Sequence, residues 1–103
     1  MTYQQITQQT AKELIETNQD ITILDVRTPE EFKKKHIKGA VCLPNEQLQG
    51  APSSLPDKAQ PILVYCRSGI RSKDAAQKLA NMNYEHVLEF GGIIHWPYPE
   101  MLE

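Results

Sequence analysis

Apolar and polar positions along the chain follow two kinds of pattern. Short runs rich in β-branched residues, which suit extended backbone, alternate with segments whose apolar residues recur every three or four positions, as on one face of a helix. The runs that predict strands are residues 4–6, 21–26, 40–43, 61–66 and 86–90. Helices are predicted up to about residue 17, from 28 to about 35, as one or two turns at 46–50, and through 73–80.

Capping residues and turn formers indicate where several of these elements begin and end. Thr28-Pro29-Glu30-Glu31 has a threonine cap, a proline in the first turn and a glutamate three residues after the cap. Either Thr7 or Thr10 is expected to cap the first helix. Thr10 is a candidate because Glu13 follows it at the capping-box spacing. Residues 51–57, with two prolines and two serines, are expected to form a loop, and Gly91-Gly92 a flexible turn.

Strands that alternate with helices favour an α/β fold: a parallel sheet of about five strands flanked by helices on both faces. The 103 residues suit a single domain covering positions 1–103. In sheets of this kind, ligands bind beyond the carboxyl ends of the strands. A functional site is therefore expected where a predicted strand ends, and Cys66 lies at such a position.

Composition and charge exclude several classes of partner. The hydrophobic fraction of 40% and the charged fraction of 23% are typical of a globular protein, and the net charge of −2 gives no general attraction to nucleic acid or to anionic membranes. No apolar stretch approaches the roughly 20 residues of a membrane span. Two cysteines are too few for a disulfide scaffold, so we expect a protein of the reducing cytoplasm. The histidines show no metal-ligand spacing, and no metal is expected.

The most informative residue for chemistry is Cys66, which ends the buried run 61–66 and begins a C-x4-R segment that leads into a helix. A helix N-terminus and the arginines at 67 and 71 favour the thiolate over the thiol. Gly69 allows the positive φ that a tight loop needs. The N–H groups of residues 67–72 are expected to converge on the sulfur and form an anion-binding nest. The alternative is a buried structural cysteine beside surface arginines.

Three blocks of the sequence resemble the rhodanese family of sulfurtransferases. Residues 23–32 (ILDVRTPEEF) are similar to the family's DVR-x-x-x-E-F/Y segment, and residues 36–40 (HIKGA) to its H-I-x-G-A continuation. Residues 66–72 (CRSGIRS) resemble the active-site loop, and residues 91–96 (GGIIHW) the closing G-G-x-x-x-W motif. The joint occurrence of these blocks in this order is far more specific than any one of them.

This resemblance implies sulfur transfer through a cysteine persulfide, with Cys66 as the nucleophile and with no organic cofactor. The donor would be a small sulfur-donor anion such as thiosulfate. The acceptor would be cyanide in the laboratory and a thiol or sulfur-carrier protein in the cell. The substrate-binding residues implied by position are Arg67, Ser68, Gly69, Ile70, Arg71 and Ser72.

Two alternatives remain beside this interpretation. Related phosphatases of the same fold use a C-x5-R loop, which is one residue longer and surrounds a phosphate. A non-catalytic rhodanese module would instead dock a protein partner, but such modules often lack the cysteine that is present here. The sequence departs from the family pattern at Lys35, where glycine is usual, and in the proline-containing tail at 97–103.

Several other residues are interpreted as structural. Asp25 and Arg27 are expected to pair with neighbouring loops, and Glu31 to act as a capping partner. Three further residues also receive structural roles: hydrogen bonding for His36, packing as a small apolar side chain for Cys42, and anchoring behind the active-site loop for Trp96.

Overall fold

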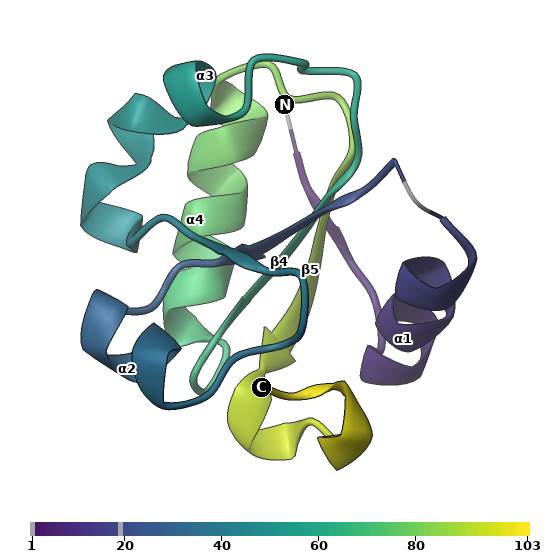
Figure 1. Ribbon diagram of the computed structural model, residues 1–103. Helices are drawn as coiled ribbons and strands as arrows, with labels where there is room; N and C mark the ends of the chain where they lie inside the picture. Colours follow the sequence, from purple (N-terminus) through teal and green to yellow (C-terminus); the bar gives the residue numbers. More distant parts are fainter. Residues whose placement is uncertain (1, 19) are drawn as a thin grey trace.

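Five parallel strands form the sheet at the centre of the molecule, in the order β1-β5-β4-β2-β3 (Figure 1). The structure is a computed structural model that describes residues 2–18 and 20–103. The strands are β1 (Gln4–Gln5), β2 (Thr22–Asp25), β3 (Val41–Cys42), β4 (Ile62–Cys66) and β5 (Val87–Gly92). The predicted parallel sheet is confirmed, and its strand order changes direction between β4 and β2.

Helices cover both faces of this sheet, as the sequence predicts. They are α1 (Gln8–Thr17), α2 (Pro29–Lys34), α3 (Ala51–Ser54) and α4 (Ile70–Asn81), with 3₁₀ turns at η1 (Asn45–Gly50), η2 (Ile93–His95) and η3 (Pro99–Met101). In Figure 1, α4 in green and α1 in purple lie on opposite sides of the sheet. None of the described helices has the length and apolar character needed to cross a membrane.

The central strand β4 contributes to two hydrophobic cores, because successive side chains of a strand point to opposite faces. All five of its residues are buried. Val64 and Cys66 belong to the core beneath α4, together with Ala75 and Leu79 of that helix. Leu63 and Tyr65 belong to the core on the other face, which α1 and the C-terminal segment cover. This burial on both faces explains why residues 61–66 read as a continuous apolar run.

The starts of α1 and α2 follow the capping chemistry of the sequence. Thr7 is the N-cap of α1, and its Oγ1 accepts a hydrogen bond from the backbone N–H of Thr10 at 3.0 Å. Of the two threonines considered for this role, Thr7 is therefore the cap. Thr28 and Glu31 form the expected capping box at α2, in which each side chain accepts from the other residue's backbone N–H.

Two local predictions are wrong. Residues 51–54 form the short helix α3 rather than a loop, since Pro52 lies in its first turn, where the missing N–H costs no hydrogen bond. Gly91 and Gly92 belong to β5 rather than to a flexible turn, and Gly92 is paired with Cys66 of β4. Glycine is needed there because the backbone of the loop after Cys66 approaches it closely.

The C-terminal tail returns to the segment that follows α2. His36 and Glu103 exchange both backbone hydrogen bonds, at 2.9 and 2.8 Å, and Ile37 forms an antiparallel bridge with Leu102. Trp96 packs against neighbouring aromatic rings in the core on the α1 face, whereas Cys66 lies in the core beneath α4. Trp96 is thus a packing anchor on the face of the sheet that α1 covers, whereas Cys66 belongs to the core on the other face.

Replacing Gly92 by alanine tests the close approach of β5 to the loop. A Cβ at this position would lie 2.2 Å from the carbonyl oxygen of Arg67 and 2.5 Å from the Cα of Ser68. Because these are backbone atoms, the loop has to move, and we expect Gly92→Ala to lower the free energy of unfolding by about 2 kcal/mol or more. Urea unfolding measures this change.

The matched control is Gly50→Ala, where no described residue outside the immediate backbone has an atom within 4 Å of the added methyl group. Its backbone φ of −83° suits alanine, so the urea midpoint should stay the same or rise slightly. Equal midpoints for the two variants would show that the contact between Gly92 and the loop does not limit stability.

Candidate active site

Cys66 lies at the carboxyl end of β4, where the chain turns sharply into α4. The turn consists of residues 67–69, and Gly69 adopts a φ of +108°, which only glycine takes without strain. This geometry points the Gly69 N–H back at Cys66 Sγ, with a nitrogen–sulfur distance of 3.0 Å. The thiol is fully buried beneath the loop, so a reactant reaches it only if part of the loop or its side chains moves aside.

Two groups of the described residues hydrogen-bond to the sulfur. The first is the Gly69 N–H, and the second is Ser72 Oγ in the first turn of α4, at 3.4 Å. The expectation that all N–H groups of residues 67–72 converge on Sγ is therefore met by Gly69 alone in this form of the protein. Gly69 is buried, whereas Arg67, Ser68 and Ile70 are exposed at the surface of the loop.

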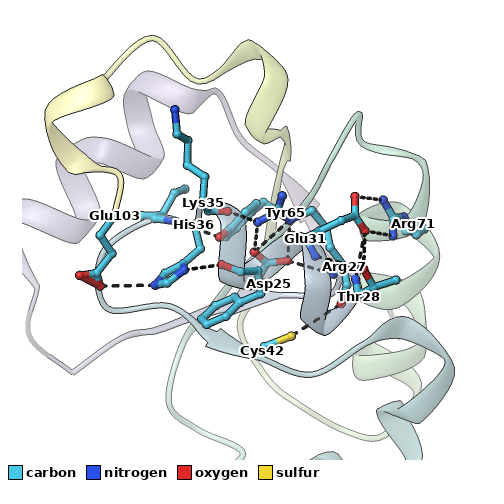
Figure 2. A network of polar contacts seen from close by, with 12 residues as sticks. Asp25, Arg27, Thr28, Glu31, Lys35, His36, Cys42, Tyr65, Arg71 and Glu103 are labelled. Carbon is cyan, nitrogen blue, oxygen red and sulfur yellow. Dashed lines mark hydrogen bonds and ion pairs between the residues drawn. The ribbon is translucent and has the colours of Figure 1, made fainter.

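The two arginines of the loop have different surroundings. Arg71 donates to both carboxylate oxygens of Glu31 on α2, at 2.8 and 3.1 Å (Figure 2). Arg67 is exposed, and its guanidinium makes no hydrogen bond or ion pair with any residue that the structure describes. Arg71 therefore joins the loop to α2, and Arg67 is the guanidinium that remains available to an incoming anion.

Glu31 has a second role that the sequence did not reveal. Besides completing the capping box, it holds Arg71, and the hydrogen bonds from that guanidinium lower the pKa of Glu31 from 4.5 to about 2. Partial burial opposes this effect, and the bonds from Thr28 add to it. The charge pair links residues 40 positions apart in the sequence. The capping box was recognisable from its spacing, but this pairing was not.

Asp25 and Arg27 form a buried ion pair at the carboxyl end of β2, and Figure 2 shows the contact between them. Arg27 donates through Nε and Nη2 to Asp25, with the shortest distance 2.7 Å, and its Nη2 also donates to the carbonyl of Lys35 at 2.6 Å. Burial lowers the pKa of Arg27, but the hydrogen bonds to Asp25 and the negative charges nearby, that of Asp25 first, together leave that pKa raised. Burial and then the charge of Asp25 raise the pKa of Tyr65. Arg27 thus reaches the segment at the end of α2, as expected, whereas Asp25 pairs with Arg27 itself rather than with a neighbouring loop.

His36 and Cys42 also lie in this network without contacting Cys66. The ring of His36 stacks on the ring of Phe32, with 3.8 Å between their centroids. Its Nδ1 lies 2.7 Å from the carbonyl oxygen of Phe32, which confirms the expected hydrogen-bonded, structural role. Cys42 is half-buried, and its Sγ lies 3.7 Å from the carbonyl oxygen of Arg27. Burial raises the pKa of the Cys42 thiol. Both cysteines of the chain are free.

Sequence reasoning missed Glu89, a fully buried carboxylate beside Ser72. Ser72 Oγ donates to Glu89 Oε2 at 2.6 Å, and the same hydroxyl contacts Cys66 Sγ. The available signal was a charged residue inside the apolar run 86–90, at the position two residues after the buried Val87. Among the described residues, no three His, Cys, Asp or Glu side chains gather in a way that could hold a metal ion.

Comparison with known proteins identifies the family of this chain. The family model for the rhodanese-like domain matches residues 7–96. The chain is 38% identical over 97 residues to the thiosulfate sulfurtransferase GlpE of Coxiella burnetii, covering 93% of this chain and 89% of that protein. It is 35% identical over 71 residues to the thiosulfate sulfurtransferase PspE of Escherichia coli, covering 68% of each.

A solved structure agrees with this assignment. The solution structure of the rhodanese-like domain from the Alr3790 protein of Anabaena is 31% identical and covers all of this chain and 80% of that one, with a TM-score of 0.85. The protein therefore belongs to the rhodanese-like domain family, whose relatives include sulfurtransferases.

The ion pair between Glu31 and Arg71 predicts a specific pH dependence of stability. Because folding lowers the pKa of Glu31, its carboxylate stabilises the folded protein above about pH 4.5, and this stabilisation is lost as the pH falls toward 2. Glu31→Gln keeps the capping geometry but removes the charge. We expect it to lower the free energy of unfolding by about 1–2 kcal/mol at pH 7.

The measurement is urea unfolding of both proteins at several pH values between 7 and 3. The difference between them should shrink below about pH 4.5, and Glu30→Gln, which removes a neighbouring exposed charge, serves as control. A difference that stays constant across this range would contradict the assignment of the stabilisation to the charged pair.

Proposed function

We propose that this protein transfers a sulfane sulfur from thiosulfate or a persulfide donor to a thiophilic acceptor through a persulfide on Cys66. The observation that carries this proposal is the position of the Cys66 sulfur: at the end of β4, accepting the Gly69 N–H at 3.0 Å, beneath a loop that presents an unpaired arginine. The thiosulfate sulfurtransferases among the relatives give the donor class.

The first half-reaction loads the sulfur. The Cys66 thiolate attacks the outer sulfur of thiosulfate, a new sulfur–sulfur bond forms, and sulfite leaves with the electron pair of the broken bond. Arg67 binds the anionic donor at the mouth of the loop. The backbone of residues 67–72, from Arg67 and Ser68 to Ser72, is proposed as the cradle for the charged terminal sulfur.

The second half-reaction passes the outer sulfur to a nucleophile. Cyanide attacks the terminal sulfur of the persulfide, thiocyanate leaves, and the bonding electron pair returns to Cys66 as a thiolate. In the cell the acceptor is a thiol or a sulfur-carrier protein. Ile70 supports such a partner, since it begins the helix that follows the loop over the nucleophile, has 79% of its surface exposed and offers an apolar contact.

The size of the loop favours sulfur over phosphate as the transferred group. Only four residues separate Cys66 from Arg71, and the guanidinium of Arg71 is turned to Glu31. A phosphate needs donors around three oxygens, whereas a persulfide needs donors around one sulfur. We therefore expect negligible hydrolysis of an aryl phosphate by the protein.

The central test is the formation of thiocyanate from thiosulfate and cyanide. Cys66→Ser should fold normally and lose this activity completely, because a serine oxygen does not hold a sulfane sulfur as a stable persulfide. Cys42→Ser is the matched control and should retain most of the activity, since Cys42 does not contact Cys66.

Mass spectrometry of protein purified without reductant should find one extra sulfur on Cys66. A wild-type rate in Cys66→Ser would refute the proposal.

The two arginines should differ in their effect on kinetics. Arg67→Ala removes the available guanidinium, and a charge-assisted contact to an anion is worth about 1.5–3 kcal/mol, so kcat/KM for thiosulfate should fall about ten- to a hundredfold, mainly through KM. Arg71→Ala should also lower the melting temperature, because it releases Glu31.

The control for these two variants is Lys34→Ala, which removes an exposed positive charge that makes no hydrogen bond or ion pair with the described residues. Its KM for thiosulfate should remain close to that of the wild type. If Arg67→Ala leaves KM unchanged as well, the backbone of the loop binds the anion without help from this side chain.

A further inference from the structure

A buried carboxylate lies one serine away from the proposed nucleophile. Glu89 is fully buried in β5, and its contacts are with neutral groups. Oε2 accepts from Ser72 Oγ at 2.6 Å and from the backbone N–H of Gly91 at 2.8 Å, and Oε1 accepts from Gln5 Nε2 at 3.2 Å. A buried charge without a cationic partner is costly, so its retention calls for a functional explanation.

The charged groups around this carboxylate are engaged elsewhere. In the part of the chain that the structure describes, Glu89 forms no ion pair. From α4, Arg71 pairs with Glu31, and Lys73 donates to the carbonyl of Gly69 at 3.3 Å. From β1 and α1, the side chains that face β5 are the neutral amides of Gln5 and Gln8, and from β4 the titratable neighbour is Cys66 itself.

Cys66, Ser72 and Glu89 are linked by two hydrogen bonds, and the donors of both can be assigned. A serine hydroxyl carries a single proton, and the contact of 2.6 Å to Glu89 has the length of a charge-assisted bond. Ser72 therefore gives its proton to Glu89 and offers a lone pair to the thiol of Cys66 at 3.4 Å. In this direction each hydrogen bond points from the sulfur toward the carboxylate.

We propose that Glu89 is a positioning residue that accepts, through Ser72, the proton released when Cys66 becomes a thiolate. The inference rests on the proposed function of Cys66 as nucleophile. The thiol proton moves to Ser72 Oγ while the hydroxyl proton of Ser72 moves to Glu89 Oε2. Afterwards Glu89 is a neutral acid that donates to Ser72, and Ser72 donates to the thiolate.

This exchange keeps one negative charge in the site before and after the transfer. Two adjacent anions, the thiolate and the Glu89 carboxylate, would repel each other in a buried environment. Moving the proton internally avoids that state and makes the thiolate available while the site is closed to water. The persulfide formed next carries the same single charge, so Ser72 continues to donate a hydrogen bond to the bound sulfur while Glu89 stays protonated.

The experiment measures the rate of alkylation by iodoacetamide from pH 4 to pH 10. The neutral reagent does not depend on the arginines, and a Cys42→Ser background leaves Cys66 as the reporting thiol. In the parent, the alkylation rate should rise with pH in two phases. The first marks the loss of one proton from the pair formed by Cys66 and Glu89, and the second, at higher pH, marks the loss of the other proton. Glu89→Gln and Ser72→Ala should each lose the lower phase, with a roughly ten- to hundredfold fall in rate on its plateau.

The variants are chosen to separate proton acceptance from packing. A glutamine at position 89 still accepts from Ser72 and Gly91, and Gln5 keeps its bond by reversing its amide. Glu85→Gln, at an exposed position before β5, is the matched loss of charge and should keep both phases. A merely structural role of Glu89 would lower the melting temperature but leave the number of phases unchanged.

Each outcome supports or overturns the inference. The inference is overturned if Glu89→Gln still shows two phases. If the glutamine variant does not fold, two phases in Ser72→Ala overturn it instead. A single phase in the parent overturns it as well. Thiocyanate formation by the parent is measured separately. If the parent forms no thiocyanate but loses its lower alkylation phase in both variants, the proposed function fails and the role of Glu89 stands.

Discussion

The pairing of β4 with β5 at Cys66 and Gly92 is the constraint on which the candidate site depends. It brings the backbone of the loop so close to Gly92 that a Cβ at that position would overlap the carbonyl of Arg67. The Ile94 N–H then donates to the same carbonyl at 3.2 Å. With its first residue fixed on β5, the loop has to reverse within three residues, and Gly69 turns its N–H to the sulfur.

The arginines near the loop have two roles: some form ion pairs that stabilise the structure, and one is left to bind the substrate. Arg71 pairs with Glu31 and so joins α4 to α2, whereas Arg27 pairs with Asp25 within the turn between β2 and α2. Arg67 stays exposed without such a partner among the described residues. Fixing one loop arginine and leaving the other unpaired allows the site to bind an anion without losing the contact that positions the loop.

The interior of the site is nearly free of cations. Ser72 and Glu89 link the sulfur to β5, and the amides of Gln5 and Gln8 complete the polar surroundings of that strand. A closed interior strengthens each of these hydrogen bonds, because little water competes for it. Which of Cys66, Ser72 and Glu89 carries the proton in each bond therefore affects the reactivity of the sulfur.

The sequence by itself determined the parallel α/β sheet, the capping box at Thr28 and the position of Cys66 at a strand end, because these depend on short-range patterns of hydrophobicity and spacing. It did not determine that Glu31 binds Arg71, or that Glu89 lies beside Ser72, since these partners are 40 and 17 positions apart. Only the strand order, which places β5 next to β4, and the packing of α2 near the loop brought them together. Contacts of this kind are set by the tertiary fold, and no local pattern of residues encodes them.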